Sequence, residues 1–207
     1  MEYSYSASES DTELYELESF TIPKTWTKYV SSNNAFSLYV PNAVELRSED
    51  DAYTKRLDNQ GLYDDYDMVF QQKDLSKMSN EALKLYCRIL IRYRECSPGD
   101  VLRSNETEPI DAETGEYFTE LAKSQVHPSQ KLLGKPSYRW IKENDINAIE
   151  ITYRRTGDAN GTTTTHGTIY LLFNYDEMVI IIIAYREQEA NIWLPNLDNI
   201  IKTFKWE

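Results

Sequence analysis

Two apolar stretches separated by a short polar segment constrain the fold of this chain more than any other feature of its sequence. Residues 167–173 and 178–185 flank Asn174-Tyr175-Asp176-Glu177, and this spacing predicts an antiparallel hairpin. The second stretch contains four consecutive isoleucines at 180–183, so it is apolar on both faces. A strand of this kind must be covered on both sides, which places it at the centre of a sheet.

Shorter segments with alternating apolar residues predict further strands. Phe36, Leu38 and Val40 share one face of a strand that stops at Pro41. Residues 44–47 alternate again, as the hairpin partner of that strand would. Strands are also expected at three other segments: 68–72, 138–141 and 148–153.

Helices are expected in three places. From Asn80, or one residue earlier, the apolar residues follow helical spacing up to a turn at 97–99. The apolar face of this predicted helix comprises Leu83, Tyr86, Cys87, Leu90 and Ile91. Residues 111–124 predict a short helix. A last helix is expected to end at Thr203 and to begin at Pro195, which suits a first turn, or two residues earlier.

Runs of strands with separate helices indicate an α+β fold, in which an antiparallel sheet is sandwiched by helices. The length of 207 residues suits one domain. We expect this domain at 19–207, with an insertion at about 97–137. Residues 1–18 contain six acidic and no basic residues, which predicts a mobile acidic tail.

The charge balance argues against two classes of partner. Lysine and arginine number 22 and aspartate and glutamate 34, so the net charge is −12. Nucleic-acid binding requires clustered cations, and the largest group is Arg88, Arg92 and Arg94 on the helix expected from Asn80. A nucleic acid or an anionic membrane surface is therefore not an expected partner. No apolar run approaches the ~20 residues of a membrane span, and the absence of a signal peptide predicts a soluble, cytoplasmic protein.

The two cysteines, Cys87 and Cys96, both fall in the helix expected from Asn80. Nine positions on a helix correspond to about 13 Å, which is too far for a disulfide. The sequence therefore predicts two reduced thiols, with Cys87 buried.

The order of elements, with its particular residues, resembles the PsbP/Mog/DcrB-like family. The matching segments are the early strand 36–41, the element from Asn80, the hairpin through 174–177 and the closing apolar pattern. That closing pattern comprises Trp193, Leu197, Ile200, Ile201, Thr203 and Phe204. The resemblance covers roughly residues 35–96 and 138–207. It implies an α/β/α sandwich and a binding role without shared catalytic residues, since relatives include a photosystem II subunit, a Ran-binding import factor and bacterial effector chaperones.

The residues that usually carry chemistry are sparse. None of the seven glycines is spaced as in a phosphate-binding loop, so no nucleotide cofactor is expected. His127 precedes Pro128 in the expected insertion, and His166 follows four threonines; both are expected to be exposed loop residues. With the cysteines apart from the histidines, we expect no metal site and no nucleophile–base pair.

Two surface features remain as candidate binding sites. Tyr63, Asp64, Asp65 and Tyr66 combine aromatic area with charge in an expected loop; a cation site there lacks the glycine and distal glutamate of a calcium loop. The chain also has 16 tyrosines, which suit either an interface or a half-buried sheet. The leading hypothesis is a non-catalytic protein-binding or chaperone-like domain that recognises another polypeptide through this loop. The alternative is a hydrolase using a carboxylate pair.

Overall fold

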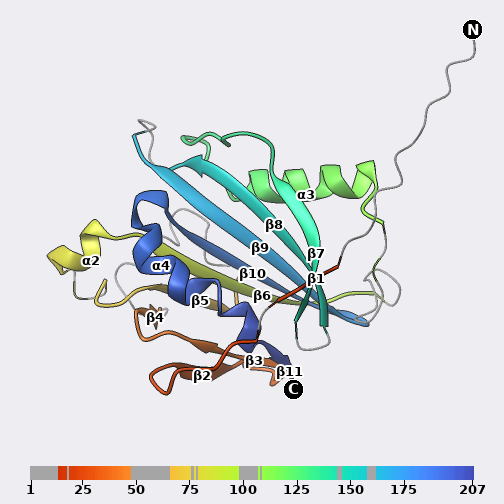
Figure 1. Ribbon diagram of the computed structural model, residues 1–207, viewed down its shortest axis with the longest axis horizontal. Helices are drawn as coiled ribbons and strands as arrows, with labels where there is room; N and C mark the ends of the chain where they lie inside the picture. The colour runs from red at the N-terminus through yellow and green to blue at the C-terminus, as the bar shows by residue number, and fades with distance from the viewer. Residues whose placement is uncertain are drawn as a thin grey trace, which may run out of the picture.

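The computed structural model describes residues 14–17, 19–47, 66–75, 77, 79–97, 107, 109–143, 146–157 and 162–207. Within these residues the strands and helices follow one another as shown in Figure 1. The first half comprises β1 (Tyr15–Glu16), β2 (Thr27–Val30), β3 (Phe36–Val40), β4 (Val44–Leu46), β5 (Met68–Gln72), α2 (Asn80–Lys84) and β6 (Cys87–Glu95). The second half comprises α3 (Ala112–Ser124), β7 (Ser137–Glu143), β8 (Ile146–Thr156), β9 (Thr164–Asn174), β10 (Glu177–Arg186), η1 (Glu187–Glu189), α4 (Ala190–Leu197), η2 (Ile201–Thr203) and β11 (Lys205–Trp206).

The described strands form two sheets. The large sheet has the order β1-β7-β8-β9-β10-β6-β5-β4, and all its pairs except β1–β7 are antiparallel. The small sheet has the order β11-β3-β2. The fold is therefore α+β with a mostly antiparallel sheet, as the sequence predicts.

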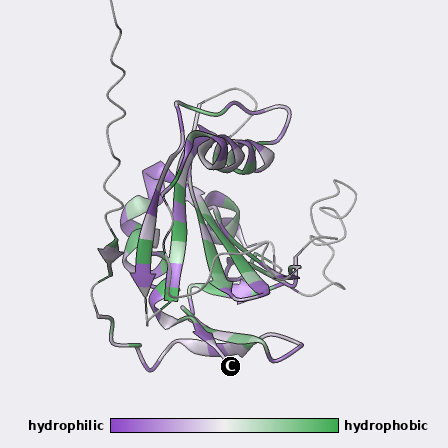
Figure 2. Ribbon diagram, turned by 90° about the vertical axis from the view of Figure 1, so that its right-hand side faces the viewer, coloured by the Kyte–Doolittle hydropathy of each residue, from purple (hydrophilic) through white to green (hydrophobic). Residues whose placement is uncertain are grey.

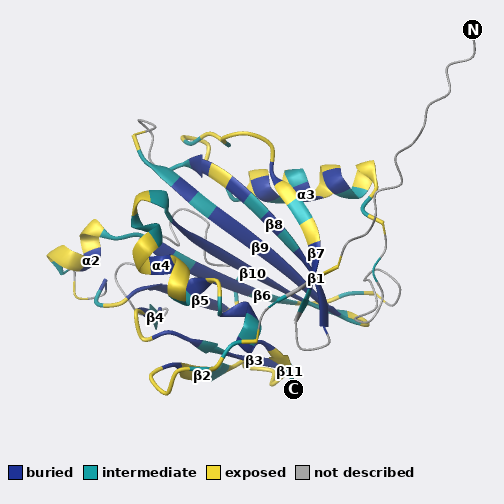
Figure 3. Cartoon of the chain, viewed as in Figure 1, coloured by how far each residue is buried: buried dark blue, intermediate teal, exposed yellow. Residues whose placement is uncertain are grey.

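Helices and the small sheet cover the two faces of the large sheet. On one face α3 buries Phe118 and Ala122 against a core that includes Leu90, Ile151 and Ile182. The other face packs against α4, η2 and the small sheet. In Figure 2 the hydrophobic segments are concentrated on the strands of the large sheet. Figure 3 shows β9 and β10 largely buried, whereas α3 alternates between buried and exposed residues.

The predicted hairpin is confirmed as β9 and β10. The two strands pair from Arg186 with Thr165 to Glu177 with Asn174, and Tyr175 turns the chain with a φ of 52°. Because β10 also pairs along its length with β6, it is an interior strand. Ile182 is only 3% exposed, so the isoleucine run lies at the centre of the sheet as expected.

The short helix expected at 111–124 is confirmed as α3. The carboxylate of Asp111 accepts a hydrogen bond from the backbone N–H of Thr114 at 2.8 Å, so Asp111 caps the first turn. This hydrogen bond lowers the pKa of Asp111. Phe118 and Ala122, one helical turn apart, form the side of α3 that packs on the sheet.

The long helix expected from Asn80 is wrong beyond its first turn. The helix α2 ends at Lys84, and residues 87–95 form the interior strand β6. Gln72 helps to end the helix, because its Nε2 donates to the carbonyls of Ala82 (3.0 Å) and Leu85 (2.7 Å) while its Oε1 accepts from the N–H of Cys87 (3.2 Å).

The cysteines are correspondingly on and beside a strand, not on a helix. Cys87 is buried in β6 and Cys96 follows its last residue, and the two cysteines do not form a disulfide. Nine positions on a strand span about 30 Å, so the expected separation of 13 Å is too short. Burial raises the pKa of the Cys87 thiol, and the charge of Glu189 adds to this rise.

The expected pairing of 44–47 with the strand at 36–40 is also wrong. Strand β4 pairs with β5 in the large sheet, whereas β3 pairs with β2 and β11 in the small one. The chain therefore crosses between the two sheets just after Pro41, and Val44 of β4 shares one core with Phe36, Leu38 and Val40 of β3.

The C-terminal helix begins earlier than expected. The helix α4 spans Ala190–Leu197, so Pro195 lies inside it, not in its first turn, and residues 201–203 form a separate 3₁₀ turn. Glu189 fixes the start of this segment, since its carboxylate accepts hydrogen bonds from the N–H of Tyr86 (2.8 Å) and from Nε1 of Trp193 (2.9 Å).

Part of the segment expected to be a tail lies on the sheet. Tyr15 and Glu16 pair in parallel with Ile141 and Lys142, and the guanidinium of Arg139 lies 4.8 Å from the ring centre of Tyr15. Residues 1–13 lie outside the described residues. Most of the loop at 48–66 and part of the expected insertion at 97–137 also lie outside them.

Candidate functional site

The face of the large sheet under α3 changes from apolar to polar toward one end. One row of laterally paired residues across the strands is apolar or aromatic: Val69, Leu90, Ile182, Ile169, Ile151 and Tyr138. The row two positions further along contains Gln71, Arg88, Ala184, Gly167 and Tyr153. The next row contains Arg186, Thr165 and Arg155. Because side chains two residues apart share a face, Arg88 and Arg155 lie on the core side of their strands.

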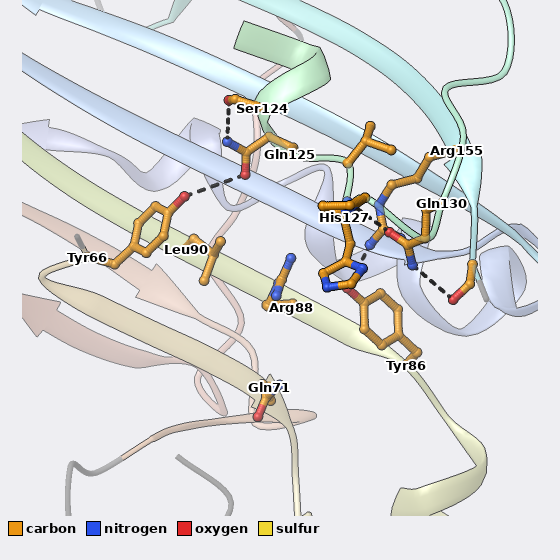
Figure 4. A pocket seen from close by; sticks show the side chains of 13 residues that line it. Tyr66, Gln71, Tyr86, Arg88, Leu90, Ser124, Gln125, His127, Gln130 and Arg155 are labelled. Carbon is orange, nitrogen blue, oxygen red and sulfur yellow. Dashed lines mark hydrogen bonds between the residues drawn. The ribbon is translucent and has the colours of Figure 1, made fainter. Parts of the chain in front are cut away.

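A cavity of about 490 Å³ opens at this polar end, beside the C-terminal end of α3 (Figure 4). Residues from β5, β6, β8 and the segment after α3 line it: Tyr66, Gln71, Tyr86, Arg88, Leu90, Ser124, Gln125, Val126, His127, Pro128, Gln130, Arg155 and Gly157. We call this cavity the Arg155 pocket. Its described lining includes two arginines and no carboxylate, although the chain as a whole has a net charge of −12.

Arg155 is the most deeply placed charged group of the pocket. The residue is 4% exposed. Its Nη1 donates to the carbonyl of Thr156 at 3.2 Å and its Nη2 to the hydroxyl of Tyr86 at 3.1 Å, whereas the buried Nε has no hydrogen-bond acceptor among the described residues. The guanidinium also lies 6.0 Å from the ring centre of Tyr86. Figure 4 shows Arg155 extending from β8 toward Tyr86.

Two neighbouring strands supply further polar groups. Arg88 projects from β6 beside Leu90, and Gln71 comes from the adjacent position on β5. Gln71 is 3% exposed, and its buried Oε1 receives no hydrogen bond from the described residues. Buried polar atoms in proteins nearly always have a partner, so Gln71 and Arg155 each carry one polar atom that the described part of the chain leaves unpaired.

The segment that follows α3 forms the opposite wall. The hydroxyl of Tyr66 donates to Oε1 of Gln125 at 3.5 Å, and Nε2 of Gln130 donates to the carbonyl of Gly157 at 3.3 Å. His127 is exposed, and its Nδ1 lies 2.8 Å from Oγ of Ser129. Aromatic, amide and cationic groups thus surround one space.

The structure brings one of the four predicted binding residues to this pocket. Tyr66 lines it, and the guanidinium of Arg92 lies 5.9 Å from the ring centre of Tyr66. Tyr63, Asp64 and Asp65 lie outside the described residues. The binding role of the four residues therefore stays a prediction.

The two histidines differ in their surroundings. His127 is an exposed loop residue, as expected, and lines the pocket. His166 is not a loop residue, because it is the third residue of β9 and is partly buried beside Tyr185, with ring centres 5.3 Å apart. Burial lowers the pKa of His166.

Two carboxylates with shifted pKa values, Asp198 and Glu187, lie outside the pocket, on the α4 side of the sheet. Asp198 follows α4, and the protein atoms around its carboxyl group raise its pKa, with a further contribution from the charge of Glu150. Glu150 in turn pairs with Arg139 at 2.9 Å. The hydrogen bond from Arg154 lowers the pKa of Glu187.

Among the described residues, three or more potential metal ligands do not come together anywhere. The prediction that the chain holds no transition metal remains to be tested by elemental analysis. Within the same residues, none of the helices has the length and apolar character required to cross a membrane.

Sequence reasoning missed Arg155, Tyr86 and Gln71 as site residues. The sequence contained one signal for Arg155. Ile149, Ile151 and Tyr153 lie at every second position, on one buried face of a strand, and Arg155 is the next position on that face. An arginine at a buried strand position is unusual. The rest of the pocket is assembled from segments that are distant in sequence.

Comparison with solved structures identifies the fold. A solution structure of cyanobacterial PsbP (CyanoP) from Synechocystis sp. PCC 6803 gives a TM-score of 0.55 at 13% identity, covering 88% of this chain and 93% of that chain. LpqN of Mycobacterium tuberculosis gives 0.48 at 12% identity, covering 87% and 89%. The Ran-binding protein Mog1p of Saccharomyces cerevisiae gives 0.44 at 14% identity, covering 87% and 95%.

No protein-family model matches the sequence, and no curated protein matches it. At 13% identity, the likeness to CyanoP over most of both chains is a likeness of fold. The antiparallel sheet between helices and the order of elements agree with the resemblance drawn from the sequence. The chain therefore has the α+β fold of the PsbP/Mog-like proteins.

Proposed function

We propose that this chain is a non-catalytic domain that binds another polypeptide, and that a group of the partner enters the Arg155 pocket. The observation that carries the proposal is the described lining of the pocket, which offers hydrogen-bonding and cationic side chains around about 490 Å³. Binding sites of this kind combine apolar walls with a few placed polar groups. Tyr66 and Tyr86 add rigid aromatic area, which suits protein interfaces.

The composition of the lining favours binding over catalysis. Hydrolysis by a side-chain nucleophile needs a nucleophile, a base and a group that orients the base. Ser129 and His127 are close, but Nδ1 of His127 also accepts the backbone N–H of Ser129 at 3.2 Å, as in a local turn. In the described part of the chain, no carboxylate lines the pocket to orient this histidine.

The proposal is tested by site-specific photo-cross-linking in lysate of the source cell. A photoreactive amino acid replaces Gln125 at the pocket, and in a matched control it replaces Tyr117, which is 56% exposed on α3. We expect a cross-linked polypeptide at position 125 that is absent at 117 and that binds the purified chain when itself purified. Equal cross-linking at both positions, or none at 125, would contradict a role for the pocket.

The loop residues are tested in the same assay. Changing Tyr63, Asp64, Asp65 and Tyr66 together to alanine is expected to weaken binding of the purified partner. Tyr66 alone changed to phenylalanine removes only the hydroxyl that bonds Gln125 and serves as the mild control. Unchanged affinity of the fourfold variant would exclude this loop from the interface.

A hydrolase that uses a carboxylate pair is the second candidate. One observation favours it: the pKa of Asp198 is raised by its surroundings and by Glu150, which is how a general acid is prepared. A screen of ester, amide and glycoside substrates with wild type and Asp198→Asn tests this candidate. Turnover that survives repurification and is lost in Asp198→Asn would replace the binding proposal.

A further inference from the structure

We propose that the Arg155 pocket recognises a carboxylate of the partner polypeptide, and that Arg155 is the residue that binds it. This inference rests on the proposed function and specifies its ligand. It follows from the burial of the charged Arg155 without a described counter-charge, from its unused hydrogen-bond donors, and from the residues that line the pocket.

The first argument is the charge of Arg155. A guanidinium remains protonated in proteins, and a charge removed from water costs several kcal/mol unless an opposite charge accompanies it. Arg155 is 4% exposed. In the described part of the chain, it makes no ion pair, and its contacts are the carbonyl of Thr156 and the side chain of Tyr86.

The neighbouring arginine in sequence has the opposite arrangement. Arg154 points to the other face of β8 and makes a two-bond ion pair with Glu187, in which Nη2 lies 2.8 Å from Oε2. The two adjacent arginines thus differ both in burial, since the side chain of Arg154 is 55% exposed, and in counter-charge. Arg154 has a carboxylate from this chain, and the described residues supply none to Arg155.

The second argument is the hydrogen-bonding capacity of Arg155. A guanidinium has five N–H donors, and two of its nitrogens each make one hydrogen bond here, to Thr156 and to Tyr86. One N–H on Nη1 and one on Nη2 therefore remain for a ligand, besides the buried Nε–H, for which the described residues supply no acceptor. A carboxylate accepts two parallel N–H bonds from a guanidinium, and such charge-assisted bonds are among the strong ones.

The third argument is the nature of the walls, which favours a carboxylate on an organic body. Tyr66, Leu90 and Val126 line the same space, so the group that enters is partly apolar. A volume of about 490 Å³ lies within the range of pockets that hold organic groups larger than a free ion. Phosphate groups on proteins are usually bound by clusters of arginines, whereas a singly charged carboxylate matches the single charge of Arg155, to which the described residues supply no counter-charge.

A partner that presents a carboxylate is compatible with the acidity of this chain. The net charge of −12 attracts a surface of basic or mixed charge at long range. The pocket then selects, at short range, one anionic group on that surface. The partner is therefore expected to have mixed charge.

The test uses three acetylated probes and the full-length protein, with binding measured by NMR titration or calorimetry. N-acetylphenylalanine presents a terminal carboxylate, and N-acetyl-aspartyl-phenylalaninamide presents only a side-chain carboxylate. N-acetyl-asparaginyl-phenylalaninamide is the matched neutral probe. We expect at least one of the first two to bind and the neutral probe to bind about ten- to a hundred-fold more weakly. Which of the two binds identifies the source of the carboxylate.

Two variants assign the binding to Arg155. Arg155→Met removes the buried charge at similar length and is expected to lose about ten- to a hundred-fold in affinity for the binding probe. Arg154→Met, which changes the net charge equally on the opposite face, is expected to retain wild-type affinity. Because Arg155→Met removes a charge without a described counter-ion, its melting temperature should equal or exceed that of wild type, so that the loss of binding is not a loss of folding.

Four outcomes would overturn the inference. They are equal binding of the neutral probe, binding of inorganic phosphate with no binding of either carboxylate probe, equal loss of affinity in Arg154→Met, and a large drop in the melting temperature of Arg155→Met. The proposed function fails separately. If Arg155→Met binds the cross-linked partner as wild type does, the carboxylate inference is wrong while the polypeptide-binding proposal stands.

Discussion

Ile182 is the residue whose environment is most completely determined by the sheet. It lies between Leu90 on β6 and Ile169 on β9 and is 3% exposed. Its side chain belongs to the core under α3, where Phe118 and Ala122 also lie. A polar group introduced at this position would have no access to water and no partner.

Replacing Ile182 with aspartate is therefore expected to unfold the domain. Burying an unpaired carboxylate destabilises a protein by about 4 kcal/mol or more, which is comparable with the stability of a typical domain. Ile192→Asp is the matched control, because Ile192 is 42% exposed on α4 and the same change there should cost about 0.5 kcal/mol. Thermal denaturation measures both, and a wild-type melting temperature for Ile182→Asp would show that β10 is not a central strand.

Asp198 gives the chain a pH dependence of definite sign. The pKa of Asp198 is raised above the ordinary value of 3.8, first by the surrounding protein and then by Glu150. Between the unfolded and folded pKa values the native state binds more protons than the unfolded state, so the contribution of this residue to stability falls as pH rises. Asp198→Asn should therefore be more stable than wild type at pH 7.

The difference between Asp198→Asn and wild type should shrink as the pH falls below 3.8, where both states of the wild type are protonated. Urea denaturation at pH 3.5, 5 and 7 measures it. A variant that is less stable than wild type at pH 7 would mean that the ionised carboxylate is stabilised by the fold.

At the level of elements, the sequence predicted best the long helices and strands whose apolar residues fit only one spacing, either helical or alternating. The β9–β10 hairpin, β8 and α3 follow directly from alternation, from the turn at 174–177 and from the cap at Asp111. The segment 80–95 could not be assigned from spacing alone, because its apolar residues fit both periods. Cys87, Ile89 and Ile91 also have the every-second-residue spacing of a strand, with Arg88 between the first two. The segment forms a strand and not a helix because it pairs with β5 and β10.

The sequence could not predict which strands would pair or which residues would form the pocket. Only Pro41, Asn42 and Ala43 separate β3 from β4, a spacing typical of a hairpin, yet β3 pairs with β2 and β11 in the small sheet and β4 pairs with β5 in the large one. The pocket joins β6 to β8 across the intervening strands β9 and β10. Such a site depends on strand order, which no local motif in this chain encodes.

The two peripheral strands β1 and β11 each have two residues, but their segments are expected to contribute differently to the free energy of unfolding. Tyr15 of β1 is 43% exposed, whereas β11 follows Phe204, which is 1% exposed and stacks on Phe36 with ring centres 5.6 Å apart. Removing residues 1–17 should cost about 1 kcal/mol. Removing residues 203–207 should cost about 4 kcal/mol or more, because a fully buried phenylalanine is lost. Urea denaturation of both truncations measures this, and equal losses would contradict the assignment.

For the whole molecule, net charge and fold together set how a partner arrives. A charge of −12 creates a long-range field, and ions screen this field beyond about 10 Å at 0.1 M salt. Arg155 is 4% exposed, so salt screens its charge less than it screens the surface charges. The association rate should therefore depend on salt concentration more strongly than the dissociation rate does.

We expect the association rate with the purified partner to fall about tenfold between low and high salt. Arg155→Met should mainly raise the dissociation rate, since it changes a buried contact, not the long-range field. Stopped-flow measurements at several salt concentrations separate the two rates. An association rate that is independent of salt would show that the acidity of this chain does not steer its partner.

The small sheet has a consequence for the biosynthesis of the protein. Its strands come from opposite ends of the described chain, since β3 pairs with β11 and Thr203 bonds to Tyr39 across 164 positions. At roughly 5–20 residues per second, a ribosome needs on the order of ten to thirty seconds to add these residues. During that interval Phe36 and Leu38 have been made but lack Phe204, which completes their packing. The strand β3 therefore remains accessible to chaperones and proteases until residues 203–206 have left the ribosome.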